Sequence, residues 1–150
     1  MQIRTSADSK DVTFIEGKTV FRTQVLAPGV VFFAISGYIG YEFSRPTMEI
    51  PARELEKAKR VVVLVDGWEI TGMNTQFREE WTEWLREIRR EFRGLFLIRS
   101  ALMAMAANVA NMVAGLRIVE TYNDPIKFEL DCAKVYPGFT YRPRRSIPAR

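Results

Sequence analysis

The chain of 150 residues contains no histidine and a single cysteine, Cys132. Without histidine it lacks the commonest general base, the commonest metal ligand, and any Ser–His or Cys–His nucleophile pair. One cysteine cannot form an internal disulfide, which is typical of a reducing compartment. A lone cysteine usually packs as a small apolar side chain, so we interpret Cys132 as structural. These absences predict a protein that is not an enzyme and that holds no metal and no cofactor.

Long hydrophobic runs are also missing. The longest mainly apolar stretch, "ALMAMAANVANMVAGL", is too short to span a bilayer and is interrupted by Asn108 and Asn111. The N-terminal "MQIRTSADSK" is polar and has no apolar centre, so no signal peptide is expected. Together with the single cysteine, this pattern predicts a cytoplasmic protein with no transmembrane segment.

Acidic residues are absent from the last stretch, "YPGFTYRPRRSIPAR". Its four arginines account for the whole net charge of +4, so residues 1–135 are neutral. A nucleic-acid-binding domain usually carries a basic face on its body, and none is expected here. We predict that residues 136–150 form a basic flexible tail, which could still make a weak contact with an acidic surface.

The remaining pattern predicts one α/β domain over residues 19–135, preceded by a loose segment at 1–18. Strands alternate with helices after residue 60, which requires a mostly parallel sheet, and the first two strands add an antiparallel N-terminal hairpin. The predicted strands cover 19–25, 30–36, 61–65, 95–100 and 117–122. The predicted helices cover 52–59, 75–92, 102–114 and 125–135.

The segment after the central strand is interpreted as a polar turn from Asp66 to Asn74, and Asn74 or Thr75 is expected to cap the next helix. Asp66 is expected to end a parallel strand. A carboxylate at that place can bind a ligand or act in catalysis. More often it accepts hydrogen bonds from the backbone amides of the turn. Trp68 either lines a pocket mouth or covers the sheet edge. An enzyme using Asp66 or Glu69 is kept as a minor alternative.

The helix predicted at 102–114 carries no charge on any face. One stripe at helical spacing is expected to pack on the sheet, namely Leu102, Ala106, Val109, Val113 and Leu116. The opposite side is expected to be covered by a protein partner, most simply in a homodimer, because an uncharged surface face is unusual. That side holds Met103, Ala107, Asn108 and Asn111. Burial by the tail or by the first helix is the alternative.

The element order, with "VVVLVDGWEITGMNTQF" after the central strand, resembles the STAS domain, and in particular its SpoIIAA-like, anti-sigma-factor-antagonist branch. The resemblance covers residues 19–135 and implies a bacterial regulatory domain that binds protein partners. In that branch a D-S-S-G turn carries the phosphoacceptor as its second serine. Counting from Asp66 places Asn74, Thr75, Gln76 and Phe77 on those four positions, so a glutamine stands in the acceptor position.

The leading hypothesis is therefore a non-enzymatic regulatory or scaffold domain that docks a protein partner or a second copy. Its contact residues would be Thr71, Asn74 and Thr75, together with the uncharged helix face. A one-residue gap would bring Thr75 into the acceptor position, yet the motif glycine would still be missing. The alternative is a small apolar ligand or lipid-binding module, with Asp66 and Trp68 as candidate lining residues and Trp81 and Trp84 nearby.

Overall fold

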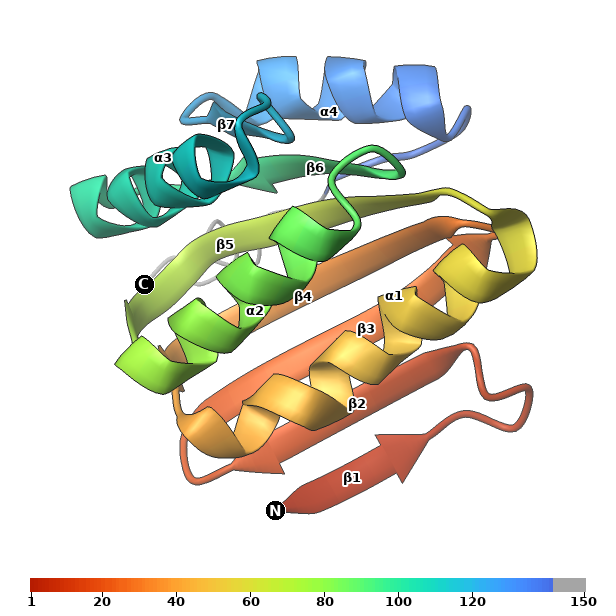
Figure 1. The fold of residues 1–150 in the computed structure, drawn as a ribbon. Coiled ribbons are helices and arrows are strands. Elements are labelled where there is room, and N and C mark those ends of the chain that lie inside the picture. Colours follow the sequence, from red (N-terminus) through yellow and green to blue (C-terminus); the bar gives the residue numbers. More distant parts are fainter. Residues whose placement is uncertain (142–150) are drawn as a thin grey trace.

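The computed structural model describes residues 1–141, except for the side chain of Leu102. Within that range the chain forms one seven-stranded sheet whose strands follow each other in chain order (Figure 1). The strands are β1 Gln2–Thr5, β2 Asp11–Glu16, β3 Thr19–Ala27, β4 Val30–Ile39, β5 Val61–Met73, β6 Phe92–Leu97 and β7 Val119–Tyr122. The helices are η1 Tyr41–Phe43, α1 Ser44–Ala58, α2 Thr75–Glu87, α3 Ala101–Ala114 and α4 Pro125–Val135.

Strand direction divides the sheet into two halves. Strands β1 to β4 pair antiparallel, whereas β4 to β7 pair parallel. The parallel half arises because each of its strands is followed by a helix that returns the chain to the starting edge. The predicted α/β fold, with a parallel centre and antiparallel N-terminal strands, is confirmed.

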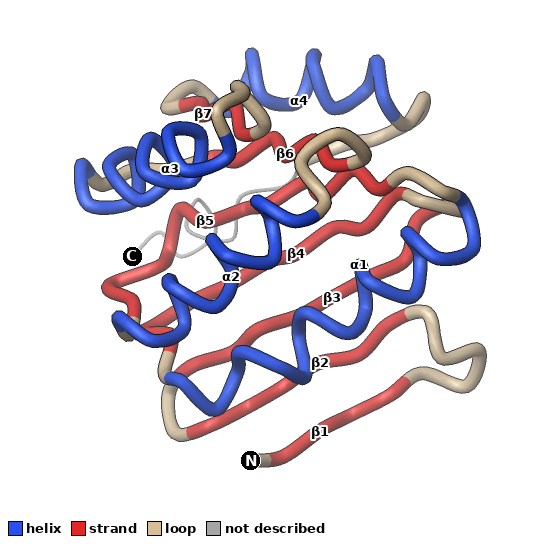
Figure 2. The backbone as a smooth tube through the Cα atoms, viewed as in Figure 1, coloured by secondary structure: helices blue, strands red, loops and turns tan. Residues whose placement is uncertain are grey.

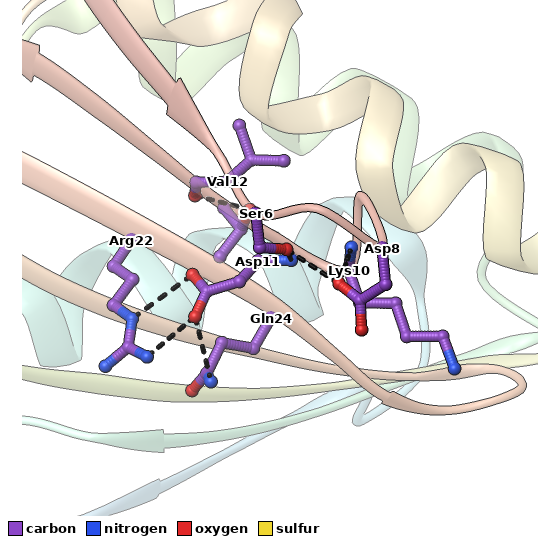
Figure 3. Close-up of polar contacts among 8 residues, drawn as sticks. Ser6, Asp8, Lys10, Asp11, Val12, Arg22 and Gln24 are labelled. Carbon is purple, nitrogen blue, oxygen red and sulfur yellow. Dashed lines mark hydrogen bonds and ion pairs between the residues drawn. The ribbon is translucent and has the colours of Figure 1, made fainter.

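The prediction of a loose segment at 1–18 is wrong, because residues 2–5 and 11–16 form two further antiparallel strands. Figure 3 shows why the turn between them is ordered: Asp8 accepts from Ser6 and from the Lys10 amide, and the Ser6 hydroxyl accepts from the Asp11 amide. Asp11 also accepts from Arg22 on β3. The alternating "DVTFIE", which buries Phe14, was the signal for this strand.

Each face of the sheet has its own hydrophobic core. Helices α1, α2 and α3 cover one face, over the larger core (Figures 1 and 2). Helix α4 covers the other, where Phe128 and Cys132 are fully buried beside Leu64 and Leu95. Burial raises the pKa of the Cys132 thiol to about 12, so the cysteine is an apolar core residue, as predicted.

Residues 136–141 belong to this second core, which corrects their prediction as part of a flexible tail. Phe139 is buried, and its ring packs against Phe32 at 5.6 Å and Phe128 at 6.1 Å between ring centres. Tyr141 is half-buried against Phe128. The segment "YPGFTY" packs on the domain in spite of its proline and glycine, because its aromatic residues cover apolar surface that α4 alone leaves open. The arginines at 142–150 lie outside the described residues.

The helix boundaries also differ from expectation. Helix α1 begins at Ser44 rather than Ala52 and contains Pro51. Helix α2 ends at Glu87, whereas the prediction extended it to residue 92. None of the described helices is long and apolar enough to cross a membrane.

Candidate functional site

The segment from Asp66 to Asn74 was predicted as a turn, but all of it except Asn74 is the second half of β5. It pairs with β4 as far as Ile39 opposite Met73, through two register shifts. Gly72 makes this pairing possible, because a Cβ there would lie 2.9 Å from a ring carbon of Tyr38. The alternation of Trp68, Glu69, Ile70 and Thr71 was the strand signal, and the neighbouring glycines concealed it.

The link from β5 to α2 is therefore a single residue, Asn74. Its side-chain oxygen accepts from the Phe77 amide at 3.0 Å, and its own amide donates to the Ile39 carbonyl at 2.8 Å. Of the two residues predicted to cap the helix, Asn74 and Thr75, the structure has Asn74 as the N-cap. Thr71 and Thr75 are exposed on either side of it, but Thr71 lies on the strand and not in a turn. Gln76, in the position of the family's phosphoacceptor, is exposed in the first turn of α2.

Replacing Asn74 with alanine should destabilise the domain by about 1 kcal/mol, because the Phe77 amide loses its capping acceptor. Asn74→Asp should retain the cap and stay close to the wild type. Urea titration followed by circular dichroism measures both free energies of unfolding. A matched control is Thr75→Ala next to the cap, and equal losses at both positions would show that the cap contributes nothing.

Glu80, one helical turn further along α2, ties this helix to the start of α1. Its two carboxylate oxygens accept from the Tyr41 hydroxyl at 2.6 Å and the Ser44 hydroxyl at 2.7 Å. These hydrogen bonds lower the pKa of Glu80 and raise that of Tyr41. The carboxylate therefore stays ionised and positions two helices rather than moving a proton.

Asp66 and Trp68, the predicted ligand-lining residues, contact other residues of the chain on the α4 side of the sheet. Asp66 accepts from the Trp68 amide and from the Tyr141 hydroxyl, each at 3.2 Å. The Arg99 guanidinium lies over the Trp68 ring, 5.7 Å from its centre. Asp66 is thus an acceptor for its neighbouring backbone, the more common of the two predicted roles. Neither residue lines the apolar cavity on the opposite face of the sheet, which lies beneath α2 and α3.

Among the described residues, no three His, Cys, Asp or Glu side chains gather closely enough to hold a metal ion. The Tyr122 hydroxyl donates to Asp131 at 2.8 Å. Burial, followed by this hydrogen bond, raises the pKa of the tyrosine, and the same bond lowers the pKa of the aspartate. This pair joins β7 to α4.

Helix α3 lies on the sheet with the face opposite to the predicted one. Met103 and Ala107 are each only 4% exposed and belong to the core, whereas Val109 and Val113 are exposed. The prediction that Met103 and Ala107 form a surface contact is wrong. Asn111 also faces inward, while Asn108 is exposed.

Asn111 explains the orientation of α3. Its side-chain oxygen accepts from the amides of Ile118 and Val119 at 2.8 Å each, and its amide donates to the Val119 carbonyl at 3.0 Å. These bonds satisfy the backbone where β7 begins, and they hold this side of the helix against the sheet. The side chain of Asn111 is therefore occupied by hydrogen bonds within the chain, contrary to its predicted role in partner binding.

Because this face of α3 packs on the sheet, large apolar side chains on its other face are exposed to solvent. Met112 is 75% exposed and Met105 57% exposed. The apolar α3 face, as we call it, consists of Met105, Val109, Met112, Val113 and Leu116. Beside Val113, a groove of about 380 Å³ is bordered by Arg86 and Glu87 of α2 and by Arg89, which follows the helix. The sequence signal for this face was present in the unbroken lack of charge between Ala101 and Leu116.

Comparison with known proteins identifies the fold. The chain matches no protein-family model and no curated protein. Among solved structures it is similar to a DUF3478-family protein with a SpoIIAA-like fold from Shewanella loihica, at 17% identity over 81% of this chain and 90% of that one, with a TM-score of 0.54. It is also similar to the anti-sigma factor antagonist SpoIIAA in its unphosphorylated form, at 10% identity over 76% and 97%, with a TM-score of 0.59. The chain therefore has the SpoIIAA-like fold.

Proposed function

We propose that this SpoIIAA-like domain is a non-enzymatic regulatory or scaffold module that acts by binding a protein through its apolar α3 face. The exposure of Met105, Val109, Met112, Val113 and Leu116 carries the proposal. Contiguous apolar patches on soluble proteins mark interaction sites, and methionine adapts well to a partner's surface. The charged residues of α2 at the edge of the patch match the polar rim of an interface.

The simplest partner is a second copy of the chain, related by a two-fold axis. Two identical helices can lay their apolar faces against each other, since each presents the same residues to the other. The absence of charge on α3 removes the repulsion that would oppose this contact. Thr71, Asn74 and Thr75 remain part of the proposal as residues that a different protein partner could reach at the start of α2.

Regulation by phosphate is not part of the proposed mechanism. Gln76 replaces the acceptor serine of the related motif, and the position after it is the buried Phe77 instead of glycine. We expect partner binding to be insensitive to protein kinases that act on serine and threonine. The fold of the two similar structures supports the module type, and the exposed face supports the mode of binding.

Sedimentation velocity tests the proposed contact. Wild-type protein should dimerise, whereas Met112→Glu should weaken the dimer at least about tenfold, because two carboxylates would enter the symmetric interface. The matched control is Leu130→Glu on α4, where the leucine is equally apolar and 61% exposed. A wild type that stays monomeric at high concentration, or equal effects of both variants, would overturn self-association.

A further inference from the structure

Two methionines lie on the outer side of α3, and they carry the most exposed sulfur atoms of the chain. Met112 is 75% exposed and Met105 57% exposed. They are seven residues apart, which makes two helical turns, so both side chains lie on the same side of the helix with Val109 between them. Met103, on the opposite side, is only 4% exposed. One helix therefore carries both the most accessible and the least accessible thioethers of the protein.

An exposed thioether is open to oxidation by a hydroperoxide. The sulfur attacks one oxygen of hydrogen peroxide, the O–O bond breaks, and an S–O bond forms while water leaves. The sulfur loses two electrons and the peroxide gains them, so the reaction balances without a cofactor. The product, methionine sulfoxide, is polar, and methionine sulfoxide reductases return it to methionine.

The single thiol of the chain does not compete for the oxidant. Cys132 is fully buried in the core under α4, and burial raises its pKa to about 12. Peroxide reacts with the thiolate form, which such a cysteine does not reach at neutral pH. The exposed methionines of α3 are therefore the sulfur atoms that a peroxide meets first.

A sulfoxide at these positions has different effects in the free chain and in the dimer proposed above. In the free chain its oxygen lies in water, so the fold is unaffected. In the dimer the same oxygen enters a contact whose helix has no charged side chain between Ala101 and Leu116. Burying a polar group without a hydrogen-bond partner is unfavourable, and two-fold symmetry places four sulfoxides in one interface. Oxidation therefore opposes the contact and leaves the fold intact.

We propose that Met105 and Met112 are an oxidation site through which peroxide dissociates two chains joined at the apolar α3 face. The inference rests on the proposed self-association. Because the dimer covers both thioethers, oxidation takes place on the dissociated chain and then prevents its reassociation. Dilute protein is therefore oxidised at these two positions faster than concentrated protein. Reduction of the sulfoxides restores the dimer.

Peptide mapping by mass spectrometry tests the oxidation site itself. Trypsin releases residues 100–117 as one peptide, whose fragment ions separate Met103, Met105 and Met112. After treatment with hydrogen peroxide, we expect oxygen first on Met112 and Met105 and last on Met103. Raising the protein concentration should slow the first two reactions. Met1 is the control whose rate should not change, because it is 46% exposed at the N-terminus, far from α3 (Figure 1).

Sedimentation velocity tests the consequence for the dimer. Oxidised wild type should dimerise at least about tenfold more weakly than untreated protein, and reductases specific for both sulfoxide epimers should reverse the loss. The double variant Met105→Leu/Met112→Leu keeps apolar side chains of similar size but has no thioether on this face. It should dimerise like wild type and keep its dimer after peroxide treatment. The matched control is Met48→Leu on α1, which should respond to peroxide as wild type does.

The outcomes separate the two proposals. If oxidised wild type dimerises as well as untreated protein, or if peroxide also dissociates the double leucine variant, the oxidation site is overturned and the docking face stands. Oxidation of Met105 and Met112 at a rate independent of protein concentration, in a protein that dimerises, would show that the contact does not cover them and would also overturn it. Untreated wild type that stays monomeric at every concentration would overturn self-association, and its control by peroxide with it.

Discussion

Replacing Met103 with aspartate should destabilise the domain by about 3 kcal/mol or more, whereas the same substitution at Met105 should change stability by less than about 0.5 kcal/mol. The two methionines lie two residues apart on α3, yet one is 4% exposed and the other 57%. Met103→Asp removes a core side chain and places a carboxylate in an apolar site. Met105→Asp places the same group in water.

The pH dependence of the Met103→Asp variant supplies a second measurement. Burial raises the pKa of a carboxyl group in the folded state above its unfolded value, so the folded state binds the extra proton more tightly. The added destabilisation is therefore largest above the raised pKa and shrinks as the pH falls towards 4. Urea titrations at pH 7 and pH 4.5, each compared with wild type, measure this change. Equal losses for Met103→Asp and Met105→Asp would refute the described orientation of α3.

Helix α3 also shows why its orientation could not be predicted from hydrophobicity. All of its faces are apolar, and the stripe through Val109 and Val113 contains the larger side chains, which normally pack inward. The indoles of α2 change this balance, because Trp81 already fills much of the space and lines the same cavity as Ala107 and Ala110. Close packing then favours small residues on the facing side. Such complementarity between helices distant in sequence leaves no periodic signal.

Strong local signals did predict much of the fold. The apolar run at 61–65 predicted the buried strand, the capping residues Asn74 and Thr75 predicted the start of α2, and the helix predicted at 125–135 agrees with α4. The errors arose where glycine and polar residues concealed extended structure. Gly67 and Gly72 suggested a turn, but both lie inside β5. Their lack of a side chain permits a close contact with a neighbouring backbone or ring. All four residues of β1 are exposed, so no apolar pattern marks this strand. It forms because its backbone pairs with the edge of β2.

The candidate sites were less predictable than the fold, because they depend on contacts between separate elements. The sequence indicated an unusual helix at 102–114, but it could not show which of its methionines are exposed. That property depends on how α3 packs beside α2 and on the bonds from Asn111 to the start of β7. Likewise, Asp66 was predicted to end the central strand, but it lies inside β5, and its bond to Tyr141 spans 75 residues.

The segment after α4 provides the second large effect. Phe139→Ala should cost about 3 kcal/mol, because the ring is 9% exposed and closes the second core between Phe32 and Phe128. The backbone cannot collapse easily around the missing ring, since the Tyr141 amide is held by Glu129 at 2.6 Å. Leu130→Ala on the exposed side of α4 is the matched control, with an expected loss below about 0.5 kcal/mol. Urea denaturation followed by circular dichroism and by tryptophan fluorescence compares the two variants. If Phe139→Ala is as stable as Leu130→Ala, residues 136–141 do not close the core, and the flexible tail predicted from sequence begins at residue 136 after all.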